Sequence, residues 1–367
     1  MSKWKKVKLG YVCSLYQPKT IPTKELKDDM PYYVYGANGI IGKYHSYNHI
    51  DSEIAIACRG ATCGTVNITL PKSWITGNAM VAHIESNELS FKYLFYALSN
   101  ANMKNVITGA AQPQITRSNL KDLEIPLPAM EKQKKIAARL DAVSDLLAKQ
   151  KQLLSEQDNL IQSTFYDMFG DPLKNNKGWK IEKLGNLFSV SSGGTPDTKN
   201  KEYWENGDIS WIGSNLCQNV ILTKNDGKFI TQKGLENSSA KIISAGSVLI
   251  ALVGATIGKT ALLTFETTTN QKIAAIDVIK NENFSSYFIF YLIQALYQEF
   301  LNIGSGKFKM ANLTFVRNLK IPIPPLELQE KFAAIVEQIE SEKSKIKSAI
   351  AETQTLFNAL MSKYFEE

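Results

Sequence analysis

The sequence carries the same eighteen-residue pattern twice. The first copy, LEIPLPAMEKQKKIAARL, occupies residues 123–140, and the second, LKIPIPPLELQEKFAAIV, occupies residues 319–336. Nine of the eighteen aligned positions are identical, and most of the others exchange one apolar residue for another. The two copies begin 196 residues apart, which exceeds the roughly 20–50 residues of a solenoid unit. The pattern therefore indicates a tandem duplication of a whole domain, and it restricts the chain to two similar halves.

Other segments follow the same duplication. Trp4 recurs as Trp179, and GATCG at residues 60–64 recurs as GATIG at residues 254–258. By residue type, Asn78 aligns with Asn270, and the run beginning at Tyr93 aligns with the run beginning at Tyr287. The offset between copies grows along the chain, so the second copy contains extra residues in its early part.

Each copy begins with a globular part built from short strands and one helix. β-Branched runs bounded by Gly, Asn and Pro predict strands at residues 54–58, 65–68 and 80–84, and at residues 248–252, 259–263 and 273–278. Apolar spacing then predicts a helix at residues 91–98 and its counterpart at residues 287–300. The Ile-Pro-x-Pro segments lack the N–H groups of a helix or a central strand, so we expect extended exits from the domains.

A long helix follows each globular part. Residues 131–168 contain no Pro or Gly, and both long segments repeat apolar residues at heptad spacing, which predicts a helix–helix seam. The seam residues are Leu140, Val143, Leu147, Leu154 and Ile161 in the first copy and Val336, Ile339, Ile346, Ile350, Phe357 and Leu360 in the second. Gln150, Gln157, Lys343 and Thr353 interrupt it, which favours one specified register. We expect the two helices to pair antiparallel about a pseudo-two-fold axis; the alternative is that each stripe packs on its own domain.

Composition bounds the class of protein without identifying a partner. The net charge is +7 and the isoelectric point is near 8.9, which permits an anionic partner such as nucleic acid. The N-terminus lacks the apolar run of a signal peptide, and no segment approaches the roughly 18 apolar residues of a membrane span. Four cysteines in such a chain indicate reduced thiols. We therefore expect a cytoplasmic protein with no membrane association.

Motifs that suggest catalysis fit their consensus poorly. In VGATIGKT (residues 253–260), three residues separate the two glycines where a phosphate-binding loop requires four, and a strand rather than a helix follows. A tight glycine turn is the better interpretation. Asp197, Asp226 and Lys228 match a loose nuclease pattern, and a loose zinc set can be drawn from His45, His49, Cys58 and Cys63. Both patterns are weak, so we expect no catalytic residue and no metal site in this chain.

Several motifs together are similar to a known family. They are the two Ile-Pro-x-Pro segments leading to Glu131-x-Gln133 and Glu327-x-Gln329, MFGDP at residues 168–172 before KGW at residues 177–179, GANGIIG at residues 36–42, and SGGTPDTKNKEYW at residues 192–204. They span nearly the whole chain in order. The chain resembles the specificity subunit of type I restriction–modification systems.

The resemblance implies an α+β architecture of two target-recognition domains joined by two long helices. The expected parts are a first recognition domain at residues 1–128, a first long helix at 129–170, a linker at 171–178, a second recognition domain at 179–324 and a second long helix at 325–367. Each domain would read one half of a bipartite double-stranded DNA target, and the helices would dock two modification subunits, with restriction subunits joining them. S-adenosylmethionine, ATP and Mg²⁺ would belong to those partners, and this chain itself would bind no cofactor.

A DNA reader needs Lys or Arg for phosphates and Asn, Gln or Arg for base edges. The candidates of the first domain are Asn38, Lys43, Arg59, Gln112 and Arg117, and those of the second are Thr195, Lys199, Lys241, Lys259, Lys307 and Lys309. For each lysine, a solvated surface charge is an equal alternative. Two rival functions stay open: a stand-alone nucleotide-dependent enzyme or nuclease, and a duplicated coiled-coil scaffold without a DNA role.

Overall fold

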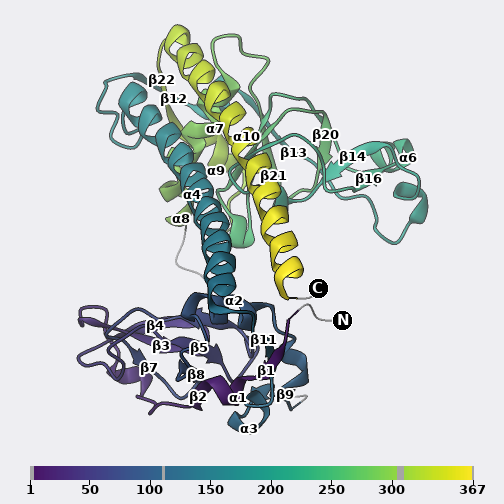
Figure 1. Cartoon of the computed structure of the whole chain (residues 1–367). Coiled ribbons are helices and arrows are strands. Elements are labelled where there is room, and N and C mark those ends of the chain that lie inside the picture. The colour runs from purple at the N-terminus through teal and green to yellow at the C-terminus, as the bar shows by residue number, and fades with distance from the viewer. Residues whose placement is uncertain (1–3, 110–111, 304–309, 366–367) are drawn as a thin grey trace. The chain divides into compact units, whose positions relative to one another are not determined.

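The computed structural model describes residues 4–109, 112–303 and 310–365 (Figure 1). The chain forms two compact units. Unit 1 contains residues 1–152 and 347–367, and unit 2 contains residues 153–346. Each unit therefore combines one globular part with one half of each long helix.

Unit 1 is built on two small sheets. The first sheet is antiparallel and has the order β2 (Cys13–Tyr16), β8 (Ala79–Ile84), β5 (Ile54–Ala57), β6 (Val66–Ile68). The second sheet has the order β4 (Gly39–Tyr44), β3 (Tyr32–Gly36), β7 (Trp74–Ile75), with β3 and β7 parallel. Helix α2 (Phe91–Asn100) shares a core with the first sheet, in which Tyr93 and Leu94 are fully buried.

Short elements complete unit 1. The strands β1 (Lys6–Lys8) and β11 (Glu124–Pro126) pair with each other, and so do β9 (Ile107–Thr108) and β10 (Gln114–Ile115). The exit segment with its prolines is therefore extended, as expected, and forms a two-stranded ribbon with the N-terminal strand. Two short α-helices, α1 (Leu9–Val12) and α3 (Arg117–Leu120), also belong to this unit.

Unit 2 repeats this architecture with additions. Its first sheet has five strands in the order β13 (Ser189–Ser192), β21 (Ile273–Asp277), β18 (Val248–Ala251), β19 (Thr260–Leu263), β15 (Val220–Leu222). Its second has the order β16 (Phe229–Ile230), β14 (Ile209–Ile212), β20 (Thr267–Thr269), β17 (Ile242–Ile243). The exit strand β22 (Lys320–Ile323) pairs with β12 (Lys180–Lys183). Strand β15 lies in the extra residues of the second copy and extends the first sheet by one strand.

The helical part of unit 2 differs from the expectation of one helix at residues 287–300. Helix α7 (Ser286–Ala295) ends before Leu296, and α8 (Tyr297–Leu301) follows it. The backbone of Leu296 leaves the helical region at φ −86° and ψ 9°. Leu296 and Phe300 are both buried in the core, and the break lets both side chains reach it. The short helices α5 (Leu184–Leu187), α6 (Gln232–Glu236) and α9 (Leu313–Asn318) complete the unit.

The strand pairing corrects two alignments between the copies. Ile56 pairs with Met80 in unit 1, and Ile250 pairs with Ala274 in unit 2, so Asn78 corresponds to Lys272 and not to Asn270. The helix caps correct the second alignment. Ser90 and Ser285 cap α2 and α7, so Tyr93 corresponds to Phe288 rather than to Tyr287. The first error matches two asparagines although the segments between the paired strands have equal lengths in the two copies. The second overlooks one extra residue that the second copy has between its strand and the N-cap of its helix.

Each long helix has 40 residues: α4 (Met130–Phe169) and α10 (Leu326–Phe365). In unit 1, Arg139 near the start of α4 donates a hydrogen bond of 3.1 Å to the Tyr364 hydroxyl near the end of α10. In unit 2, Phe165 near the end of α4 lies 5.6 Å from Phe332 near the start of α10, measured between ring centroids. Within each unit the two helices are therefore antiparallel. Together with the two tandem α/β domains, this confirms the expected fold class.

The predicted seam residues face inward in both units. Leu140, Leu147, Ile161, Val336 and Ile339 are buried, and the remaining seam residues are half-buried; none of the eleven is exposed. Helix-on-domain packing also occurs, because Leu140 shares the core of unit 1 and Val336 shares that of unit 2. The seam and the alternative interpretation are therefore compatible: one stripe serves both contacts.

A charged cluster interrupts the seam in unit 2. The Lys343 ammonium lies 2.6 Å from an Asp158 carboxylate oxygen and 2.5 Å from one of Glu340, and the Lys343 side chain is only 10% exposed. Burial alone would lower the pKa of Lys343, but the hydrogen bonds to Asp158 and Glu340 outweigh it and leave that pKa raised. The equivalent position in unit 1 is Leu147, so the two copies of the seam differ here.

The structure explains why the Glu-x-Gln motif occurs twice. Gln133 is fully buried; its carboxamide oxygen accepts from the Ser90 N–H at 2.9 Å, and its nitrogen donates to the Glu88 and Pro128 carbonyls at 2.7 and 2.8 Å. Gln329 repeats this pattern in unit 2 with Ser285, Asn283 and Pro324. One carboxamide thus ties together the start of a domain helix, the proline exit and the start of a long helix. Across the described ranges, no helix is long and apolar enough to cross a membrane.

Candidate nucleic-acid interface

Four loops of unit 1 meet at one edge of the globular part. They follow strands β2, β5 and β7 or precede β10, so the sheet positions them together. Gln17, directly after β2, donates from Nε2 to the Gly77 carbonyl at 3.0 Å and to the Cys58 sulfur at 3.0 Å. The Gly60 N–H donates to the Pro113 carbonyl at 3.1 Å, and the backbones of Arg59 and Gln114 form an isolated antiparallel β-bridge.

The side chains at this edge are of the types that DNA-binding proteins use to contact bases and phosphates. The exposed residues in these four loops and at the start of β10 include Gln17, Arg59, Asn78, Gln112 and Gln114, which we call the unit 1 reading edge. Carboxamides can pair with adenine edges and guanidinium groups with guanine edges or phosphates. Gly60 has a φ of +80° and open space around its Cα, so the turn after Arg59 can approach a ligand closely.

Unit 2 has a corresponding edge. Thr195, after β13, donates from its hydroxyl to the Gln271 carboxamide oxygen at 2.8 Å, and Asn270 follows β20 as Thr76 follows β7 in unit 1. Residue Asn215 approaches the same place: its carboxamide oxygen and the Asn270 nitrogen both flank Gly213. We call Thr195, Asn215, Asn270, Gln271 and Lys272 the unit 2 reading edge. The scaffold of the edge is repeated, but its side chains differ from those of unit 1.

The structure brings some of the predicted DNA-binding residues of unit 1 together. Arg59 and Gln112 belong to the reading edge, and Asn38 lies in the turn beyond β3, next to the end of β7 that leads into Thr76. Arg117 starts α3 two residues after β10 and is exposed. Lys43 is elsewhere: it pairs with Tyr33 at the other end of the hairpin, with its ammonium 5.2 Å from the Tyr33 ring centroid.

In unit 2 the agreement is smaller. Thr195 belongs to the reading edge, and Lys241 follows Ala240, against which Gly194 packs. Lys259 instead donates to the Gln218 carboxamide at 2.9 Å, and the exposed Lys199 lies in a turn closed by Asp197. Lys307 and Lys309 lie outside the described residues.

Sequence reasoning missed most carboxamides of the two edges. Gln17, Asn78, Gln114, Asn215 and Gln271 were not among the candidates. Their shared signal is position: each lies in a loop at the end of a strand of the repeated sheets, one to three residues from it for all but Gln114. Gln114 begins β10 itself. The polar residues that directly follow or precede the predicted strands are the set in which these carboxamides occur.

The suspected catalytic motifs have structural roles. Gly254–Thr256 forms a single 3-10 turn between β18 and β19, as the glycine-turn interpretation predicts. Asp226 lies 3.8 Å from Lys228, and the Asp197 carboxylate accepts from the Lys199 N–H, so both act within their own turns. Of the loose zinc set, Cys58 accepts from Gln17 and His49 bonds with the Tyr16 hydroxyl. Among the residues that the structure describes, no group of three or more His, Cys, Asp or Glu could hold a metal.

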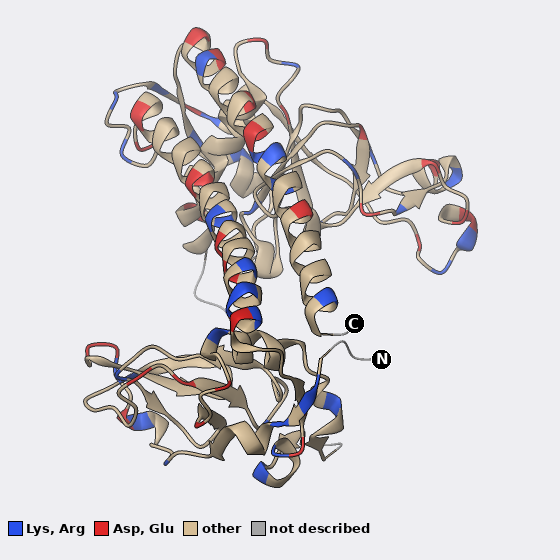
Figure 2. Ribbon diagram, in the orientation of Figure 1, with Lys and Arg blue, Asp and Glu red and all other residues tan. Residues whose placement is uncertain are grey.

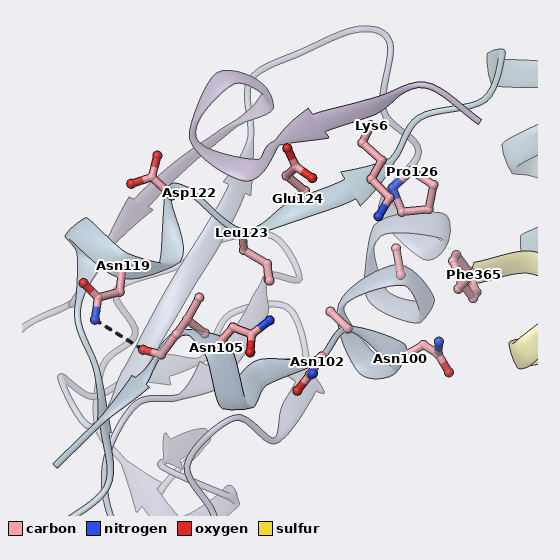
Figure 3. Close-up of a pocket in the computed structure, with 13 residues that line it drawn as sticks. Lys6, Asn100, Asn102, Asn105, Asn119, Asp122, Leu123, Glu124, Pro126 and Phe365 are labelled. Carbon is pink, nitrogen blue, oxygen red and sulfur yellow. Dashed lines mark hydrogen bonds between the residues drawn. The ribbon is translucent and has the colours of Figure 1, made fainter. Parts of the chain in front are cut away.

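A separate groove is drawn in Figure 3, and none of its described lining residues belongs to the unit 1 reading edge. It has a volume of about 850 Å³ and is lined by α2, α3 and β11, with Asn100, Asn102, Asn105 and Asn119 among its polar groups. Asp122 and Glu124 also line it. A hydrogen bond from Lys8, at 2.9 Å, lowers the pKa of Asp122, which keeps this carboxylate charged. Carboxylates repel phosphates, so this groove is not part of the DNA-binding candidate.

Comparison with known proteins identifies the family of the chain. The family model of the type I restriction modification DNA specificity domain matches residues 1–156 and again residues 176–353. The chain belongs to this family. It is 26% identical to the specificity subunit of the type I restriction enzyme MjaIX from Methanocaldococcus jannaschii, over 68% of this chain and 62% of that protein.

Two further similarities extend this result. The chain is 26% identical to the EcoR124I/EcoR124II specificity subunit from Escherichia coli, over 71% of this chain and 66% of the relative. The chain thus spans less than two thirds of the length of these two curated relatives. A crystal structure of the type I restriction–modification S subunit from M. genitalium has the same fold, with a TM-score of 0.66 at 18% identity, over 99% of this chain and 96% of that one.

Proposed function

We propose that this chain is the DNA-recognition subunit of a type I restriction–modification enzyme and that each unit reads one half of a bipartite target. One observation carries the proposal: the same loop edge occurs in both units, exposes side chains that pair with bases, and differs in side chains between the units. Two different edges on one repeated scaffold are what two different half-sites require.

The long helices supply the spacing. Each has 40 residues and is about 60 Å long. At about 3.4 Å per base pair, this length matches two short half-sites separated by an unread spacer on one duplex. The helices themselves would contribute no sequence information. Acting on cellular DNA, the protein would work in the cytoplasm.

The helices also offer docking surfaces for partners. Five of the six exposed large apolar side chains on their described parts directly precede a seam residue: Leu146, Leu153, Leu160, Ile335 and Leu356. A two-helix seam needs only its own stripe, whereas a wider apolar face is typical of helices in larger bundles. This apolar strip supports docking of two modification subunits through helices, with charged neighbours such as Lys134, Lys135, Arg139, Glu337 and Lys345 at the rim.

Catalysis would belong to those partners. The proposal assigns methylation with S-adenosylmethionine to the modification subunits, and ATP- and Mg²⁺-dependent cleavage to the restriction subunits. This chain would bind and position without reacting. Purified chain alone should hydrolyse no nucleotide and cut no DNA; either activity would favour the rival enzyme. If the assembled complex fails to bind DNA at both low and high salt, the coiled-coil scaffold without a DNA role is the favoured function.

Exchange of one reading domain tests the division of labour. Replacing residues 5–124 with the matching domain of a relative should change one half of the methylated sequence and leave the other half and the spacer unchanged. The readout is a map of methylated adenines in cells that carry the complete system. A change in both half-sites would contradict the modular reading.

A single substitution tests the unit 1 reading edge. Arg59→Ala should weaken DNA binding of the assembled complex by about 1–3 kcal/mol, if Arg59 pairs with a base, and relax the sequence requirement of one half-site only. Lys43→Ala is the matched control, because Lys43 lies over Tyr33 and away from the edge. Equal losses for the two variants would show that the effect is general surface charge.

A further inference from the structure

The apolar strip along the long helices has flanking charges that differ between the units. The strip continues along each helix in steps of seven residues, and its positions in unit 1 include Arg139, Leu146, Leu356 and Lys363. We call these four residues the basic face. The same positions in unit 2 are Leu160, Asp167, Ile335 and Glu342, which we call the acidic face.

Helix geometry places the members of each face on one side of the helix pair. Residues seven apart share a side of a helix, and two antiparallel helices of equivalent register present equivalent positions on the same side. The globular part packs on the opposite side: in unit 1, Asp141 of α4 accepts from the Tyr96 hydroxyl at 2.7 Å, and in unit 2, Tyr291 packs on Phe332 of α10 at 5.5 Å. Each face is therefore open to a partner.

The two faces oppose each other in charge. Each exposes two apolar side chains at equivalent positions, and unit 2 exposes one further strip residue, Leu153, where unit 1 has Ala349. The basic face exposes Leu146 and Leu356, and the acidic face exposes Leu160 and Ile335. Their remaining members are two cations in unit 1 and two carboxylates in unit 2. The next positions around each helix, Lys149 with Glu352 and Glu156 with Lys345, add no net charge to either face. Figure 2 shows these mixed charges along both helices.

From this difference we infer that two identical modification subunits bind this chain with unequal affinity. The inference rests on the proposed docking function. Both copies of the partner present the same helical surface, with the same charges. A charged group on that surface is attracted by one face and repelled by the other, while the apolar contacts differ only by Leu153 against Ala349. One subunit therefore docks first, and a complex with one modification subunit accumulates before the complex with two.

The electrostatic origin gives a specific dependence on salt. A single exposed ion pair contributes little to binding. Attraction on one face and repulsion on the other change the two affinities in opposite directions. At low salt the dissociation constants of the two binding steps should therefore differ by roughly tenfold more than the statistical ratio. Salt screens both effects. Raising ionic strength should weaken the tighter step, strengthen the weaker one and bring the two together.

Titration of the full chain with its cognate modification subunit tests the inference, with native mass spectrometry or sedimentation resolving the species. We expect two separated steps at about 0.05 M salt that lie closer together at about 0.5 M. The double variant Glu342→Leu, Asp167→Lys gives the acidic face the residues of the basic face at these positions and should narrow the separation between the steps and remove most of its dependence on salt. The matched control Glu342→Asp, Asp167→Glu keeps both charges and should keep the steps separate.

The outcomes are distinguishable. Two steps at the statistical ratio in the unmodified chain, or separate steps that ignore salt and the double variant, would overturn the unequal docking while leaving the proposed function intact. Absence of any binding of the modification subunit would overturn the docking proposal and this inference with it. The substituted side chains are on the helix surface, and circular dichroism of each variant confirms that the helices are retained.

Discussion

The buried glutamine of the repeated motif gives the sharpest test of how each unit is held together. Gln133→Ala removes three hydrogen bonds to backbone groups of Ser90, Glu88 and Pro128, all shorter than 3.0 Å. Ser90 is the N-cap residue of helix α2 and its side chain makes no capping hydrogen bond, so Gln133 anchors this end of the helix through the Ser90 N–H. At about 1 kcal/mol per bond, and with the cost of a small cavity, we expect a loss of about 3–5 kcal/mol.

Urea unfolding of the full chain measures this loss, and hydrogen exchange localises it. The loss should appear in the unfolding transition of unit 1, and the amides at the start of α2 should lose protection. Gln329→Ala is the matched variant and should affect unit 2 by a similar amount while leaving unit 1 unchanged. A loss below about 1 kcal/mol for Gln133→Ala would refute the reasoning, because three buried hydrogen bonds cannot be worth so little.

The variant Gln133→Glu adds a test with a defined sign. The carboxylate accepts from Ser90 but opposes the carbonyls of Glu88 and Pro128, so folding disfavours its charged form and raises the pKa of the new carboxyl. The folded state then binds more protons than the unfolded state between the two pKa values, and stability rises as the pH falls. The deficit relative to the natural chain should therefore shrink between about pH 7 and pH 4. A deficit that grows on acidification would contradict the hydrogen-bond assignment.

Two further predictions concern buried charge and buried thiols. Lys343→Leu should change the free energy of unfolding by less than about 1 kcal/mol, because Leu147 occupies the equivalent position and Asp158 keeps contact with water. The reverse change, Leu147→Lys, should lower that free energy by about 3 kcal/mol or more, because no pair of carboxylates surrounds this position. Urea unfolding of both variants measures the two effects. Burial raises the pKa of Cys13 and Cys217 to about 12, so these thiols stay protonated and should resist alkylation at pH 8 until the protein unfolds; rapid labelling of native Cys217 would contradict its burial.

The sequence alone determined the duplication, the long helices and most strands. These features depend on local signals: heptad spacing, β-branched runs, and prolines that remove donors. These signals do not depend on the rest of the chain, because each reflects the need of a single helix or strand to bury one of its faces. The repeat then predicted two domains and two helices.

Only the tertiary structure decided which residues meet. Gln17, Asn78 and Gln114 are far apart in the chain and unremarkable in sequence, and they converge because strand order places their loops at one edge. The pairing of Lys343 with Asp158 likewise depends on helix register, which no single helix encodes. The physical reason is that strand order and helix register are set by long-range packing of whole elements, whereas periodicity reports only the face that each element buries.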